Sequence, residues 1–110
     1  MFSRELKKGS TELLILALLE GRPRHGYELG KLIETRSGGR LQFRIGSLYP
    51  ILCRLESQDL IVGRWVEQPG ERSRRYYRLT VEGRAALGQQ RRDWQDFTGA
   101  VNQILGGEHA

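Results

Sequence analysis

The stretch Gly46–Glu56, GSLYPILCRLE, decides the fold because it contains both a helical pattern and a helix breaker. Three leucines recur in it at i, i+4 and i+7: Leu48, Leu52 and Leu55. Pro50 stands among them, and proline inside a helix removes a backbone hydrogen bond. In the first turn that loss costs little, because the amide groups there have no helical acceptor. We therefore predict a helix that begins with Ser47 as its N-cap and buries the leucines.

The opposite face of this predicted helix is polar at its start. Ser47, Tyr49 and Arg54 point toward solvent, and Arg44 lies just ahead of the helix as a candidate phosphate contact. Free amides, the positive end of the helix dipole and short polar side chains are suited to phosphates and base edges. An ordinary surface helix whose tyrosine covers the core has the same pattern and is common, so these residues alone favour that interpretation over a DNA contact.

A β-hairpin is predicted to follow this helix. Residues 60–66 and 75–79 are rich in β-branched and aromatic types, and the Pro-Gly pair in EQPGERS marks the turn between them. Four arginines lie near the tip and along the return strand: Arg72, Arg74, Arg75 and Arg78. After a helix-turn-helix pattern, a basic hairpin is typical of a wing that contacts the phosphate backbone. The alternative, a charged strand edge that discourages aggregation, is less favoured in this context.

The last segment predicts one long helix, with Thr80 as its N-cap, Leu105 at its end and a glycine pair beyond. At about 1.5 Å per residue it would extend for roughly 38 Å, more than so small a domain can cover. Two interleaved heptad series run along it: Leu87, Trp94 and Val101, and Gln90, Phe97 and Ile104. Apart from Gln90 this stripe is apolar, which favours a symmetric dimer over a helix that folds back on its own domain.

Two further helices are predicted upstream, one in STELLILALLEG after Ser10 or Thr11 and one over Tyr27–Arg36 with Tyr27 on its inner face. The 110 residues form one domain by length. We predict a mainly α fold with a small β-hairpin. Residues 1–79 would form a winged helix-turn-helix DNA-binding domain, and residues 80–110 a C-terminal dimerisation helix and tail.

The composition is compatible with a polyanionic partner, and equally with an arginine-rich proteome and a solvated surface. Lysine and arginine number 18 against 13 acidic residues, a net charge of +5, and 15 of the 18 are arginine, whose planar fork suits phosphates and bases. An arginine-rich proteome would give the same count. The N-terminus lacks an apolar signal core, and the longest apolar run, Leu13–Leu19, is too short to span a bilayer. We expect a cytoplasmic protein without membrane contact.

Enzymatic chemistry is not predicted. Cys53, the single cysteine, excludes an intrachain disulfide and an all-thiolate metal site, and its helical context predicts a small buried hydrophobe. His25 sits in a turn and His109 near the end of the chain, and no HExxH, P-loop, GxSxG or GxGxxG motif occurs. We expect no cofactor and no metal. The alternative to a DNA-binding regulator is a winged-helix module that binds a ligand or a protein without operator binding.

The strings ELLILALL, HGYEL, GSLYPILCRLE and RRYYRLTVEGRAAL, in this order, resemble the PadR family of bacterial winged-helix transcriptional regulators across nearly the whole chain. The resemblance implies a dimeric repressor of a nearby promoter, with the helix near Ser47 in the major groove and the wing on the flanking backbone. The single closing helix is similar to that of the family's short subgroup. One departure is Asp59, which stands where the family usually has a glycine, and aspartate tolerates the left-handed cap better than most residues.

Some members of that subgroup bind planar aromatic molecules in a pore at the dimer interface, lined partly by a tryptophan of the last helix. Trp94 is at the position that resembles it and is the candidate contact for a small aromatic effector. Packing of Trp94 in the dimer seam is an equally good interpretation. On the resemblance and the residues together, we expect DNA contacts from seven residues: Arg44, Ser47, Tyr49, Arg54, Arg72, Arg74 and Arg75.

Overall fold

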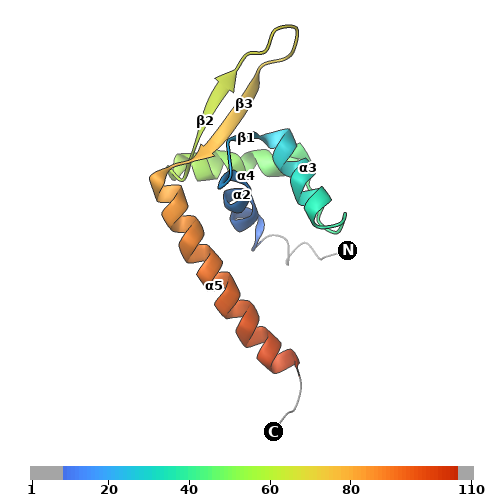
Figure 1. The fold of residues 1–110 in the computed structure, drawn as a ribbon, viewed down its shortest axis with the longest axis vertical. Helices are drawn as coiled ribbons and strands as arrows, with labels where there is room; N and C mark the ends of the chain where they lie inside the picture. Colours follow the sequence, from blue (N-terminus) through green and yellow to red (C-terminus); the bar gives the residue numbers. More distant parts are fainter. Residues whose placement is uncertain (1–8, 107–110) are drawn as a thin grey trace.

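The structure, a computed structural model, describes residues 9–106, which form a small helical domain with a hairpin on one side and a long helix on another (Figure 1). The elements in chain order are α2 (Thr11–Leu19), β1 (Arg24–His25), α3 (Gly26–Arg36), α4 (Ile45–Ser57), β2 (Ile61–Val66), β3 (Arg74–Leu79) and α5 (Val81–Leu105). The predicted mainly α winged-helix fold is confirmed. The segment considered as a leader and the tail with His109 lie outside the described residues, in part or in full.

The core lies where α2, α3, α4 and the base of the sheet meet. Leu48, Leu52 and Leu55 are fully buried, as the spacing predicted. They pack in one cluster with apolar residues of every other long element, including Ile15, Leu16, Leu29, Ile33, Ile61, Tyr77 and Leu87. Helix α2 is apolar on nearly every side and supplies the centre of this cluster. The burial of α4's leucine stripe fixes which side of that helix remains outside.

The start of α4 differs from the prediction. The helix begins at Ile45 with Arg44 as its N-cap, so Ser47 lies within the first turn and Pro50 lies inside the helix. The extended backbone at Arg44 lets its carbonyl oxygen accept from the amides of Ser47, at 2.9 Å, and Leu48, at 3.1 Å. Proline at position 50 cannot donate to the carbonyl of Gly46, and that group faces an exposed part of the helix. The early start adds a turn whose residues face solvent.

The end of α4 is a left-handed cap at Asp59, which has a φ of 60°. The Leu60 amide donates to the Leu55 carbonyl at 3.0 Å, and the Asp59 amide donates to the Glu56 carbonyl at 3.0 Å. This pair of bonds satisfies carbonyl groups that the helix end would otherwise leave open. Aspartate therefore keeps the turn that a glycine would make, as the sequence predicted.

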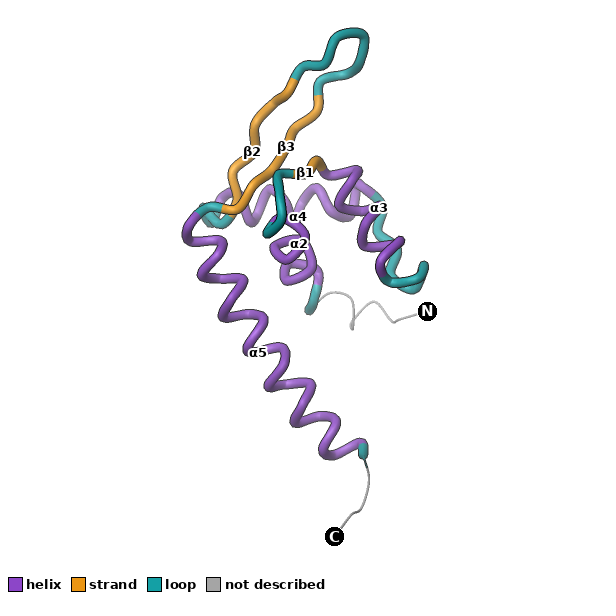
Figure 2. The backbone as a smooth tube through the Cα atoms, in the orientation of Figure 1, coloured by secondary structure: helices purple, strands orange, loops and turns teal. Residues whose placement is uncertain are grey.

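The sheet has three antiparallel strands in the order β1-β3-β2. The predicted hairpin is confirmed, with Ile61 opposite Leu79, Gly63 opposite Tyr77 and Trp65 opposite Arg75. Strand β1, which pairs Arg24 with Tyr77, was not predicted, because RPRHG has the composition of a loop. Beyond the sheet, the loop of the hairpin extends away from all the helices (Figure 2), so the wing stands clear of the core.

Helix α5 leaves the domain rather than covering it (Figure 1). Thr80 caps its start by accepting from the Gly83 amide at 2.9 Å. Leu87 packs in the core, and the ion pair of Arg91 with Glu20, the C-cap residue of α2, at 3.1 Å, lies farther along the helix. The radius of gyration is 16.0 Å, against roughly 13 Å for a compact chain of this length. None of the helices among residues 9–106 combines the length and apolarity that crossing a bilayer requires.

Candidate nucleic-acid interface

The first turn of α4 is exposed and carries no acidic residue. In α2, α3 and α5 a glutamate occupies the first turn, namely Glu12, Glu28 and Glu82. A first-turn carboxylate offsets the partial positive charge of a helix N-terminus. The start of α4 therefore keeps its positive end available, and exposed Arg44, which has no ion pair with a described residue, adds a full charge beside it.

Ser47 and Tyr49 are both exposed near the start of α4, Tyr49 by 55%. A side-chain hydrogen bond with Cys53 raises the pKa of Tyr49, so its phenol stays protonated as a hydrogen-bond donor. Cys53 is itself exposed, which corrects the expectation of a buried cysteine. It lies outside the leucine stripe, which is the side of α4 that faces the core.

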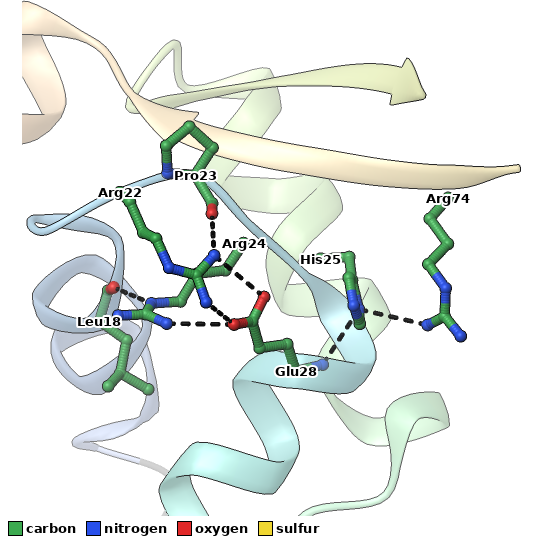
Figure 3. Close-up of polar contacts among 7 residues, drawn as sticks. All are labelled: Leu18, Arg22, Pro23, Arg24, His25, Glu28 and Arg74. Carbon is green, nitrogen blue, oxygen red and sulfur yellow. Dashed lines mark hydrogen bonds and ion pairs between the residues drawn. The ribbon is translucent and has the colours of Figure 1, made fainter. Parts of the chain in front are cut away.

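The wing carries further exposed arginines. Arg72 lies in the hairpin loop and Arg74 at the start of β3, and both are exposed. The Arg74 Nη1 atom lies 3.5 Å from His25 Nδ1, which connects the wing to the start of α3 (Figure 3). These side chains retain donors for a phosphate. Arg74 lines one hollow with Ile45 and Tyr49 of α4, and Arg44 lines a neighbouring hollow that also includes Ile45.

Arg75 has a different environment, because it holds the wing on α4. Its Nη2 atom donates to Glu56 Oε2 at 2.6 Å, and the same oxygen accepts from the Gly63 amide at 3.1 Å. The guanidinium lies over the rings of Trp65 and Tyr77, at 5.7 and 5.8 Å from their centroids. A Cβ on Gly63 would stand only 2.5 Å from Arg75 Nε. Glycine at this position of β2 therefore leaves the space that the Arg75 side chain occupies. Arg75 is placed to fix the wing's angle.

Arg54 is also held within the chain. Its Nη2 and Nε atoms lie 2.7 and 3.2 Å from Glu12 Oε2, which ties the C-terminal half of α4 to the start of α2. Its side chain remains 53% exposed. Of the seven residues predicted to contact DNA, Arg54 and Arg75 therefore have carboxylate partners, and the other five do not have one among the described residues.

His25, considered in the sequence for catalytic chemistry, is the N-cap of α3. Its Nδ1 atom accepts from the Glu28 amide at 3.1 Å (Figure 3), and its ring meets Tyr76 edge-on at 5.2 Å. Burial lowers the pKa of His25, and the charge of Arg74 lowers it further, although Glu28 opposes this. A neutral ring leaves Nδ1 free to accept, which is what the cap requires.

The loop ahead of α3 is fixed by two arginines that share one carboxylate. Arg22 and Arg24 both contact Glu28, and Arg24 Nε donates to the Leu18 carbonyl at 2.7 Å (Figure 3). These contacts join the end of α2 to the start of α3. They orient the first helix of the helix-turn-helix against the core, and with it the face that α4 exposes.

Four large apolar side chains are exposed on the described part of the winged helix, residues 9–79, and the sequence predicted a functional role for only one of them. They are Tyr27, Ile45, Tyr49 and Trp65. All four line one shallow hollow of about 170 Å³ between α3, α4 and the wing. Tyr27, expected on the inner face of its helix, is 62% exposed. No signal in the sequence separates these residues from core residues, because their spacing fits a buried face equally well.

The second exposed apolar surface is on α5. Trp94, Phe97 and Ile104 are 45, 63 and 79% exposed, and Val101 is half-buried. Leu87, grouped with this stripe in the sequence, is only 2% exposed and packs in its own chain's core. The ring centroids of Trp94 and Phe97 lie 6.4 Å apart. We call Trp94, Phe97, Val101 and Ile104 the α5 stripe.

Among residues 9–106, no cluster of three or more histidine, cysteine, aspartate or glutamate side chains is placed to hold a metal ion. In the part of the chain that the structure describes, His25 Nδ1 serves the α3 cap and Cys53 lies beside Tyr49, so neither pairs with the other as nucleophile and base. What the arrangement does offer is a positively charged helix end and a basic wing.

Comparison with known proteins gives one family. The model of the Transcriptional regulator PadR-like family matches residues 15–89. Transcriptional regulator Rv3488 of Mycobacterium tuberculosis is 36% identical over 107 residues, covering 96% of this chain and 92% of that protein. A PadR family transcriptional regulator from Eggerthella lenta superposes with a TM-score of 0.83 at 32% identity, covering 94% of this chain and 88% of the other. A transcriptional regulator from Clostridium thermocellum reaches 0.85 at 27% identity, covering 94% and 97%.

Proposed function

The chain belongs to the Transcriptional regulator PadR-like family, and from this premise we propose that it is a sequence-specific DNA-binding repressor that acts as a homodimer. Its family and structural neighbours are transcriptional regulators, not enzymes. The observation that carries the proposal is the exposed, acid-free start of α4 beside a basic wing. We place its action in the bacterial cytoplasm, where promoter DNA is found.

In this proposal, the start of α4 enters the major groove and the wing contacts the flanking backbone. Ser47 and Tyr49 would meet base edges or nearby phosphates, while Arg44, Arg72 and Arg74 would meet phosphates. Arg75 contributes through the wing angle, given its bond to Glu56. Arg54 would contact DNA only through the guanidinium N–H groups that do not donate to Glu12.

The pair Arg74→Ala and Arg75→Ala tests this division of roles. Arg74→Ala is expected to weaken binding of all sequences alike, to reduce the slope of log K against log salt by about one, and to leave the melting temperature unchanged. Arg75→Ala is expected to lower the melting temperature as well, because Glu56 and two aromatic rings lose their partner. Fluorescence anisotropy on duplex DNA and thermal melts followed by circular dichroism measure both.

Two results would contradict the roles. If Arg74→Ala binds DNA with the native affinity and the native salt dependence, the wing is not part of the DNA interface. A native melting temperature in Arg75→Ala would show that its contacts with Glu56, Trp65 and Tyr77 do not hold the wing.

The dimer would form through the α5 stripe. Its aromatic and aliphatic side chains are exposed, and α5 extends away from the winged helix (Figure 1), so a second copy of the chain can cover them. Symmetric pairing is the commonest way to bury such a stripe, and it sets two recognition helices at a fixed separation for two half-sites. Residues 9–79 would then read DNA and residues 80–106 would hold the pair together.

Repression would follow from occupancy of an operator that overlaps a promoter. In vitro transcription from the upstream promoter should fall as protein is added, and an unchanged or increased transcript would contradict repression.

A small aromatic effector at Trp94 would release the dimer by favouring another separation of the recognition helices. In a Trp65→Phe variant, whose only tryptophan is Trp94, such a compound should quench fluorescence, and no quenching by any planar aromatic tested would argue against the effector.

A further inference from the structure

The hollow between α3, α4 and the wing is mainly apolar, although Arg74 and Arg75 are among the residues that line it. Every large apolar side chain that the described part of the winged helix exposes lines it, and Leu52 and Tyr77 form part of its floor. A surface that meets only phosphates would gain nothing from four exposed apolar groups. The hollow therefore indicates that the polyanionic partner also presents apolar groups at this place.

Ile45 and Tyr49 are the two lining residues that α4 carries to its exposed end. Ile45 is the first residue of the helix and is 49% exposed, and Tyr49 follows one turn later at 55%. Ile45 is held from one side by α3, since a Cβ on Gly26 would lie 2.7 Å from Ile45 Cδ1. Packed against backbone on one side and open on the other, this isoleucine is a fixed apolar contact at the start of the helix.

The surroundings of these two residues identify the partner's chemistry. Arg44 precedes Ile45 directly, Arg74 lines the same hollow beside the Glu56-paired Arg75, and the first turn of α4 carries no carboxylate. These charges select a phosphate polymer. In the major groove of DNA the only apolar group on a base edge is the 5-methyl of thymine. A recognition helix whose first turn carries an exposed isoleucine is suited to that group.

We propose that Ile45 and Tyr49 read thymine by packing against its 5-methyl group in the major groove, with Tyr27 and Trp65 closing the hollow around the adjacent sugar. The proposal rests on the proposed function, because it specifies which base the α4 surface recognises. In this proposal, apolar contact recognises the base at this position, and the arginines bind the phosphates.

The test replaces thymine by deoxyuridine, which keeps base pairing and removes only the methyl group. The full chain first selects its preferred duplex from a random library. Each thymine of that duplex is then exchanged singly for deoxyuridine, and affinity is measured by fluorescence anisotropy. Burial of one methyl is worth about a fourfold change in affinity, so at least one thymine in each half-site should show a loss of about this size.

The variant Ile45→Ala should bind the thymine and deoxyuridine duplexes with more nearly equal affinity, and Tyr49→Ala should act in the same direction. Val81→Ala is the matched control, because Val81 is an exposed β-branched residue at the start of α5 and does not line the hollow. It should keep the full fourfold difference. Should Ile45→Ala melt before binding can be measured, Ile45→Val, which removes one methylene, should still reduce the difference.

Three outcomes overturn the proposal. If a preferred duplex is selected but every deoxyuridine exchange is tolerated, DNA recognition stands and methyl reading fails. If thymine sensitivity is unchanged in both the Ile45 and the Tyr49 variants, another residue reads the methyl group. If no duplex is preferred over random DNA, the proposed function fails together with this inference.

Discussion

A Phe97→Asp variant is expected to be monomeric and to bind a two-half-site operator about 100-fold more weakly than the native chain. Phe97 lies in the middle of the α5 stripe, 63% exposed and 6.4 Å from Trp94 between ring centroids. A carboxylate there would be removed from water in a dimer seam without a cationic partner on the stripe, which is strongly unfavourable. Loss of the dimer leaves each recognition helix to bind one half-site alone.

The control for this variant is Gln95→Asp, which places a carboxylate two residues earlier, about 200° around the helix axis from Phe97. It should remain dimeric and keep its affinity. Light scattering after size exclusion gives the oligomeric state, and anisotropy gives the affinity. A Phe97→Asp protein that stays dimeric and binds normally would mean that α5 does not form the interface.

A Gly83→Ala variant is expected to lose about 3 kcal/mol of folding stability and to melt roughly 10 °C lower or more. A Cβ at this position would stand 1.9 Å from the Leu60 carbonyl oxygen and 2.9 Å from its carbon, which is backbone and cannot rotate away. That oxygen also accepts from the Thr80 amide and hydroxyl, both at 3.1 Å. Moving it would disturb the junction of β2, β3 and α5.

Gly99→Ala is the matched control, because Gly99 lies in the same helix with no atom within 4 Å of an added Cβ. It should leave stability unchanged or raise it by about 0.5–1 kcal/mol, the usual gain of alanine over glycine in a helix. Thermal melts at one protein concentration compare the two. Equal melting temperatures for the Gly83 and Gly99 variants would contradict the packing at the start of α5.

The parts of the fold that the sequence predicted are those set by periodicity and caps. The leucine stripe of α4, the hairpin with its Pro-Gly turn and the Thr80 cap of α5 all have local signals, and they are present in the structure. Strand β1 has no such signal, because two residues become a strand only through pairing with β3. Its existence depends on tertiary contact.

The site was predicted less completely, for physical reasons that single residues illustrate. Ile45 stands three residues before Leu48, at a spacing that fits the buried stripe, but it packs against Gly26 of α3, which has no side chain to cover it, and it remains 49% exposed. In the sequence, Arg75 cannot be told apart from the other wing arginines. Only the fold brings its Nη2 atom to 2.6 Å from Glu56 Oε2. Charge and periodicity locate a surface, whereas partners across elements decide what each side chain does.

The most direct test of the central claim is fluorescence anisotropy of the full chain on its own upstream DNA and on a scrambled duplex of the same composition, across a salt series. We expect tighter binding to the upstream DNA, with log K falling linearly as log salt rises, because phosphate contacts by the α4 start and the wing release counterions. Equal binding to both duplexes, or no binding to either, would contradict sequence-specific operator recognition.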